Sequence, residues 1–168
     1  GGAAHRFDVS VSDAEKLVSV LKRSAKHSGD YALTTSRRTS KPVEQFLKAS
    51  LAQDPACKLL VIANEDNPSF AAGGMMGAAD ILIVTEDSLA MISEAVGTGK
   101  KVIVLDLGEG DLPSKHYRFH QVLGQRGLVT LSCLNDLEKN ISELFKKEES
   151  PAVDRERNAL IQKLGELL

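Results

Sequence analysis

Two short apolar runs, residues 81–84 and 102–105, constrain the fold of this chain more than any other feature of its sequence. Each run holds four consecutive apolar residues, which is typical of a strand covered on both faces. The segment between them is long enough for one helix and ends in Gly97 and Gly99, which favour a helix end. Strand, helix and strand in this order predict a parallel βαβ unit with a right-handed crossover.

The same alternation continues along the rest of the chain. Apolar periodicity predicts helices over residues 13–27, 43–51, 69–79, 88–98, 115–124 and from residue 135. Strand patterns occupy residues 31–35, 58–63, 81–84, 102–105 and 128–131. Ser12 and Glu15 have the spacing of a capping box at the start of the first helix. The glycines of the 69–79 segment indicate close packing or a distorted first turn in that helix.

These patterns predict an α/β fold, with a Rossmann-like parallel sheet and helices on both of its faces. The length of 168 residues fits one such domain, which we place at residues 1–150. After Pro151, apolar residues at helical spacing predict a C-terminal amphipathic helix of the same domain over residues 151–168. Gly1 and Gly2 open the chain where a domain of this type normally has a buried strand. We therefore expect that a preceding half belongs to a longer protein.

Composition narrows the class of partner. A formal net charge of −2 argues against a dedicated nucleic-acid surface or an anionic membrane surface. Cys57 and Cys133 form no CxxC pair, and no histidine stands at metal-ligand spacing, so a disulfide framework or a zinc site is not expected. No run approaches the roughly 18 apolar residues of a membrane span. We expect a small-molecule partner and a cytoplasmic location, at most peripheral to a membrane.

Hydroxyl and guanidinium groups gather in residues 34–39, between an expected strand and the next helix. Arg37 and Arg38 offer planar forks for bidentate phosphate contacts, and Ser36 and the following helix N-terminus add hydrogen-bond donors. This pattern is typical of an anion cradle. The alternative interpretation is that both arginines are solvated loop charges, one of them paired with a carboxylate.

A second polar cluster, Glu86, Asp87 and Ser88, follows the strand at residues 81–84, at the edge where ligands bind in open parallel sheets. Helical spacing puts three apolar residues on one buried face, namely Leu89, Ile92 and Val96. It puts three others on the opposite face, namely Asp87, Met91 and Glu94. Glu94 can then accept hydrogen bonds from two ribose hydroxyls, while Ser88 and the first-turn N–H groups meet a phosphate.

Two alternatives apply to this second cluster. Glu94 can be a surface side chain, and Asp87 or Ser88 can act as an ordinary helix cap. Glu86 and Asp87 also have the chemistry of divalent-metal ligands, but adjacent residues rarely point at one centre, so we expect no metal. His116 and His120 are four residues apart on an expected helix, and we interpret them as surface or core residues.

In combination, three segments resemble the C-terminal half of the mitochondrial-fission ELM-like family: residues 34–39, Asn67-Pro68 and residues 84–102. Bacterial members of that family often carry the label of predicted nucleoside-diphosphate-sugar epimerases. The resemblance spans most of residues 1–145, and the combined order and spacing of the motifs is specific. The family is in turn similar to glycosyltransferases of the B-type fold, in which two Rossmann-like domains face a cleft.

The resemblance implies that this chain is the C-terminal domain of a B-type glycosyltransferase fold, which grips the nucleoside-diphosphate-sugar donor. By motif position, Glu94 would hold the ribose, and Asp87 and Ser88 would meet the diphosphate. Ser36, Arg37 and Arg38 would face the phosphates. Binding without a cofactor or metal is implied. The facing domain usually supplies the catalytic base, so the catalytic residues are unknown and we expect the isolated chain to be inactive.

Two functional hypotheses follow from this comparison. The first is the donor-binding domain of a nucleotide-sugar-dependent glycosyltransferase or epimerase-like enzyme. The alternative is a non-catalytic binding or scaffold module of the same family, which would use its surface for protein partners. In either case the apolar stripe of residues 151–168 predicts a contact with the missing N-terminal domain or self-association with a neighbouring chain.

Overall fold

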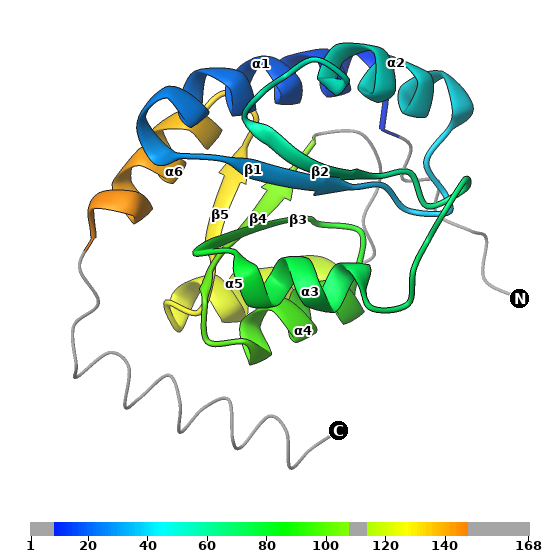
Figure 1. The fold of residues 1–168 in the computed structure, drawn as a ribbon. Coiled ribbons are helices and arrows are strands. Elements are labelled where there is room, and N and C mark those ends of the chain that lie inside the picture. The colour runs from blue at the N-terminus through cyan, green and yellow to red at the C-terminus, as the bar shows by residue number, and fades with distance from the viewer. Residues whose placement is uncertain (1–8, 108–113, 148–168) are drawn as a thin grey trace, which may run out of the picture.

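The computed structural model describes residues 9–107 and 114–147. The helices are α1 (Val11–Ser28), α2 (Lys41–Leu51), α3 (Ala71–Ala78), α4 (Leu89–Gly97), α5 (Ser114–Gln125) and α6 (Leu137–Lys146). The strands are β1 (Tyr31–Thr34), β2 (Cys57–Val61), β3 (Ile81–Thr85), β4 (Lys101–Asp106) and β5 (Thr130–Cys133). Helices and strands alternate along the chain, which confirms the predicted α/β fold (Figure 1). The helix predicted over residues 151–168 lies outside the described residues.

Within residues 9–107 and 114–147, every strand pair is parallel, and the strands form two sheets in place of the one expected. One sheet contains β1 and β2, and the other has the order β3-β4-β5. The register of β3 on β4 runs from Ile81 opposite Lys101 to Thr85 opposite Leu105. The predicted βαβ unit is therefore confirmed, with α4 as its crossover helix.

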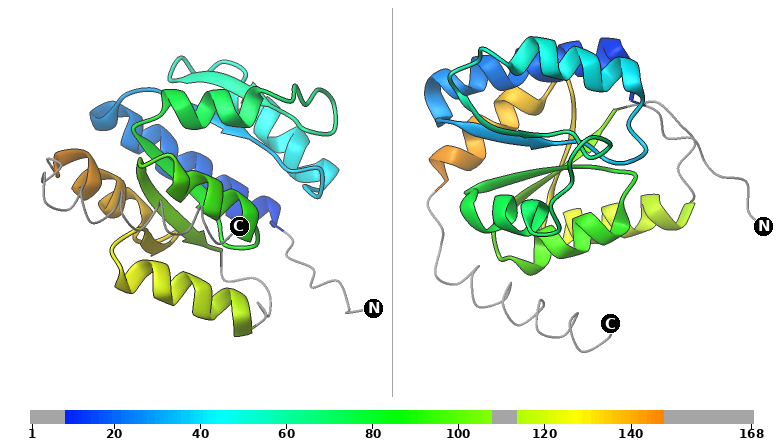
Figure 2. Two further views of the ribbon diagram at one scale, coloured as in Figure 1. Left: turned by 90° about the horizontal axis from the view of Figure 1, so that it is seen from below. Right: turned by 45° about the vertical axis from the view of Figure 1, so that its right-hand side comes forward.

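Helices cover both faces of the sheets, as predicted. Helices α1, α2 and α6 lie on one side, and α3, α4 and α5 lie on the other (Figures 1 and 2). The strand β4 is the centre of this arrangement, because Ile103 and Leu105 pack toward α1 and α6 while Val102 and Val104 pack toward α4 and α5. No helix within residues 9–107 and 114–147 is long and apolar enough to cross a membrane.

The N-cap of the first helix lies two residues before the predicted one. Ser10 is the N-cap, and its hydroxyl oxygen accepts a hydrogen bond from the backbone N–H of Asp13. The same hydroxyl donates to the Asp13 carboxylate. The prediction of Ser12 as the cap was wrong, because serine followed three residues later by a carboxylate occurs twice in this stretch and both readings satisfy the motif. At the other end, Gly29 has φ 87°, a conformation that favours glycine as a helix stop.

The glycines of α3 do not mark close packing. A Cβ atom added at Gly73, Gly74 or Gly77 would meet nothing within 4 Å. The packing explanation for this composition is therefore wrong. Helix α3 contributes Met76 to the core shared with α4 and β4, and its glycines lie at exposed positions.

Candidate functional site

The loop after β1 is a tight turn organised by its own hydroxyl groups. The N–H of Thr39 donates to the Ser36 carbonyl at 2.9 Å, and the N–H of Ser36 donates to the Thr39 hydroxyl at 3.0 Å. The Ser36 hydroxyl oxygen accepts from the N–H of Arg38 at 3.2 Å. Both arginine side chains project to solvent from this turn. The sequence therefore fixes the backbone of the loop and leaves the guanidinium groups at its surface.

An ion pair joins this loop to the loop after β3. The Arg38 Nη2 atom lies 2.6 Å from Asp87 Oδ2, and the Thr85 hydroxyl donates to Asp87 Oδ1 at 2.7 Å. The Asp87 side chain is only 13% exposed, whereas that of Arg38 is 66% exposed. The structure thus brings together two of the predicted site residues from distant parts of the chain. This pairing matches the alternative interpretation for one of the two arginines.

Arg37 differs from Arg38 in its surroundings. Its side chain is exposed, and in the part of the chain that the structure describes no ion pair or side-chain hydrogen bond involves it. A guanidinium in this state keeps its full hydrogen-bonding capacity for an external anion.

Ser88 begins helix α4 as its N-cap. Its hydroxyl oxygen accepts from the backbone N–H of Met91 at 3.4 Å. Capping does not exclude ligand binding, because other first-turn N–H groups have no partner inside the helix. Glu94 is exposed on the same helix, as predicted, and no contact within residues 9–107 and 114–147 joins it to the other predicted site residues. The prediction that Met91 lies on the face opposite the buried one was wrong. Its side chain is half-buried and packs against the core, because the buried stripe of α4 is wider than predicted.

Thr85 stands opposite Leu105 in the register of β3 on β4. The residues that follow them, Glu86 and Asp106, therefore lie beside each other. Burial, the Asp106 charge, a hydrogen bond to the Asp106 side chain and the Asp87 charge together raise the pKa of Glu86 from 4.5 to about 7. Glu86 is therefore partly protonated near neutral pH. Sequence reasoning missed Asp106, although its position directly after the run at 102–105 was the same signal that identified Glu86.

Two histidines of α5 lie near these carboxyl groups. His120 is only 4% exposed, and burial lowers the pKa of its imidazole. The neighbouring His116 also lowers this pKa, while Asp106 raises it. Neither His116 Nδ1 nor His120 Nε2 has a hydrogen-bond partner among the described residues. Their rings are in an edge-to-face arrangement with centroids 6.5 Å apart.

A buried glutamate ties the loops after β1 and β2 together. Glu44 of α2 accepts hydrogen bonds from Asn64 at 2.8 Å and from Thr35 at 3.5 Å. The Thr35 hydroxyl oxygen in turn accepts from the N–H of Ala63 at 2.9 Å. Asn64 therefore has a structural role at this edge. Glu44 carried no recognisable sequence signal, and Thr35 was marked only as a member of the 34–39 cluster, because the pairing of the two side chains depends on the packing of α2 on the sheet.

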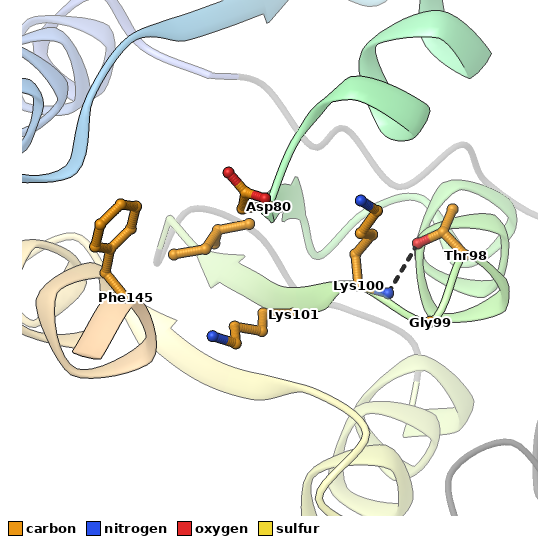
Figure 3. Close-up of a pocket in the computed structure, with 7 residues that line it drawn as sticks. Asp80, Thr98, Gly99, Lys100, Lys101 and Phe145 are labelled. Carbon is orange, nitrogen blue, oxygen red and sulfur yellow. Dashed lines mark hydrogen bonds between the residues drawn. The ribbon is translucent and has the colours of Figure 1, made fainter. Parts of the chain in front are cut away.

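A hollow of about 560 Å³ lies at the opposite edge of the sheet (Figure 3). Its lining comes from the amino ends of β3 and β4, the end of α4 and α6: Asp80, Ile81, Thr98, Gly99, Lys100, Lys101 and Phe145. Lys101 Nζ donates to the carbonyls of Leu144 and Lys147, at 2.9 and 2.8 Å. This lysine therefore provides hydrogen-bond donors for carbonyl groups at the C-terminal end of α6. Within residues 9–107 and 114–147, no three His, Cys, Asp or Glu side chains form a group that could hold a metal ion.

The chain was also compared with known proteins. A family model described as "Mitochondrial fission ELM1" matches residues 1–153. No curated protein and no solved structure matched the chain. The family match covers most of the 168 residues and both of the polar loops described above. The chain therefore belongs to the mitochondrial fission ELM1 family.

Proposed function

We propose that this chain is the donor-binding domain of a nucleotide-sugar-dependent glycosyltransferase or epimerase-like enzyme. The nucleoside diphosphate would bind at the carboxyl edge of the sheet. The observation that carries this proposal is the ion pair between Arg38 and Asp87, which holds the arginine loop against the start of α4. Arg37 belongs to the same loop and is exposed, without an ion pair among the described residues; a guanidinium group in this state and a helix N-terminus both favour an anion.

Each predicted residue has a role in this proposal. Arg37 contacts the diphosphate directly, and Arg38 keeps the loop in place through Asp87. Ser88 and the free N–H groups of the first turn of α4 bind phosphate oxygens, and the exposed Glu94 accepts the ribose hydroxyls. Positive charge at this edge would stabilise the diphosphate as it leaves the sugar, because negative charge develops on the departing oxygen.

Transfer to an acceptor requires a base within hydrogen-bond reach of the attacking hydroxyl. We assign that base to a facing domain outside this chain, and the chain alone then binds the donor without transferring the sugar. The carboxyl pair of Glu86 and Asp106 has a local role in this proposal, since it sets the charge of the edge beside Asp87.

A thermal-shift screen against UDP-, GDP-, ADP- and CMP-sugars tests the proposal and identifies the nucleotide base of the donor. One nucleotide class at millimolar concentration should raise the unfolding temperature, because a ligand that binds only the folded state stabilises it. Inorganic pyrophosphate should compete with that ligand, and the free sugar should have no effect. If no nucleotide sugar shifts the transition, the donor site is absent, and the scaffold role suggested by the family's description becomes the better account.

A further inference from the structure

Carboxyl groups gather at the edge of the sheet where β3 and β4 end, which is also the edge of the proposed anion site. The N–H of Glu86 donates to the Leu105 carbonyl at 3.1 Å. This bond extends the pairing of β3 with β4 and sets the Glu86 and Asp106 side chains beside each other. Asp87 follows Glu86 directly in the chain. Each ionised carboxylate repels a phosphate, so the charge of this cluster affects how well the edge binds one.

Asp87 and Glu86 differ in what balances their charge. Asp87 lies 2.6 Å from the Arg38 guanidinium group and accepts a hydrogen bond from the Thr85 hydroxyl. Glu86 is half-buried, and no ion pair within residues 9–107 and 114–147 involves it. Its carboxyl group shares a hydrogen bond with Asp106, which requires a proton on one of the two. A proton therefore does for Glu86 what the Arg38 cation does for Asp87.

Helix α5 adds two imidazoles on the other side of this pair. His120 is buried, its Nε2 atom has no hydrogen-bond partner among the described residues, and its imidazole interacts with the charge of Asp106. Burial, followed by the neighbouring His116, lowers the pKa of His120, so this imidazole is neutral near pH 7. Around the pair of Glu86 and Asp106, the described residues thus place Asp87 with its Arg38 partner and two histidines of α5.

We propose that the carboxyl pair of Glu86 and Asp106 is a proton switch for the anion site at this edge, which binds an anion tightly when the pair holds its proton and weakly when the proton is lost. This inference rests on the proposed function, because the anion is the one assigned to Arg37 and the first turn of α4. The switch adjoins that site through its chain neighbours. Asp87 holds the arginine loop, and Ser88 begins α4.

The sign of the pH dependence follows from the charge of Glu86. Its pKa is raised to about 7, by burial and then by Asp106, so its carboxyl group gains a negative charge between about pH 6 and about pH 8. Anion affinity should therefore fall as the pH rises through this window. The linkage is reciprocal: a bound anion disfavours the ionised form of Glu86, and the protein takes up protons as the anion binds.

Sulfate is the probe for this switch, because its charge is constant in this pH range, whereas pyrophosphate and nucleotides titrate. NMR shifts of the Ser36, Arg37 and Arg38 amides give the dissociation constant at pH 6 and pH 8, at equal ionic strength. The unchanged chain should bind sulfate about three- to tenfold more tightly at pH 6, a change equivalent to at most about one pKa unit.

Glu86→Gln keeps the size of the side chain but cannot titrate. This variant should bind sulfate with nearly equal affinity at the two pH values, and about as tightly as the unchanged chain does at pH 6. Glu143→Gln, on the exposed face of α6, is the matched control and should keep the full pH dependence. Carbon NMR of the Glu86 carboxyl group should show that sulfate moves its titration to higher pH.

The outcomes separate the switch from the site that it regulates. Equal sulfate affinity at both pH values in the unchanged chain would overturn the switch and leave the anion site standing. The same pH dependence in Glu86→Gln would also overturn it, because another group would then be responsible. If neither sulfate nor pyrophosphate binds at either pH, the anion site itself is absent, and the switch falls with it.

Discussion

The side chains of Glu86 and Asp106 are hydrogen-bonded to each other where β3 and β4 end. Two carboxyl groups can share such a bond only if one of them holds a proton. The parallel register creates the pair, because Thr85 stands opposite Leu105 and the next residues of both strands are acidic. The carboxyl edge is therefore less negative near neutral pH than its sequence implies, which suits an anion-binding edge.

This pair should make the stability of the protein depend on pH. The pKa of Glu86 is raised from 4.5 to about 7 in the folded chain, so the folded state retains a proton that the unfolded state loses across this window. The contribution of Glu86 to the free energy of unfolding is thus fully present below about pH 4.5 and is lost as the pH rises through about 7. Glu86→Gln should raise the free energy of unfolding at pH 8 by about 1 kcal/mol, a figure reduced for solvent screening.

Urea denaturation of both proteins at pH 5 and pH 8 measures this difference. The advantage of the glutamine variant should be larger at pH 8. Glu143→Gln, on the exposed face of α6, serves as the control and should show no such pH dependence. An equal effect of Glu86→Gln at both pH values would mean that Glu86 does not titrate in this range.

The ion pair between Arg38 and Asp87 should stabilise the protein only weakly through its charge. Arg38 is largely exposed, so Arg38→Ala should lower the free energy of unfolding by less than about 1 kcal/mol. Asp87→Ala should cost more, because it also removes the acceptor of the Thr85 hydroxyl. A double-mutant cycle by urea denaturation isolates the coupling between the two side chains. Strictly additive effects of the two substitutions would show that the pair does not form in solution.

The start of α1 gives a matched pair of substitutions. Ser10→Ala should lower the free energy of unfolding by about 1 kcal/mol, because it removes the acceptor of the Asp13 N–H. Ser12→Ala, at an exposed position inside the helix, should have an effect within about 0.5 kcal/mol of zero. Chemical denaturation of both variants compares them, and a larger effect at Ser12 would place the cap where the sequence pattern first indicated it.

The isolated chain should bind a donor without transferring its sugar. Release of nucleoside diphosphate can be followed with whichever nucleotide sugar stabilises the chain, with and without candidate acceptors. No acceptor-dependent turnover is expected, because the base is assigned to a facing domain. Turnover by this chain would show that the base lies within its 168 residues, and Glu86 would then be the first residue to substitute.

The sequence was informative where local patterns decide structure. Apolar runs located β3 and β4, and the polar residues after β3 marked the carboxyl edge. The sequence did not predict contacts between residues that are far apart in the chain. The bond between Glu86 and Asp106 depends on strand register, and the contact between Arg38 and Asp87 depends on how the two sheets are placed by α1. The cap of α1 was misplaced because two overlapping motifs satisfied one local rule.

The most direct test of the donor site is titration calorimetry of the stabilising nucleoside diphosphate with Arg37→Ala and Glu94→Ala. Each substitution should weaken binding by about 1 to 3 kcal/mol, the scale for losing a hydrogen bond to a charged group. The matched controls are Arg126→Ala, after α5 on the amino side of β5, and Glu143→Ala, and both should leave the affinity unchanged. Unchanged affinity in both site variants would contradict the proposal that this chain binds a nucleotide-sugar donor at the carboxyl edge of its sheet.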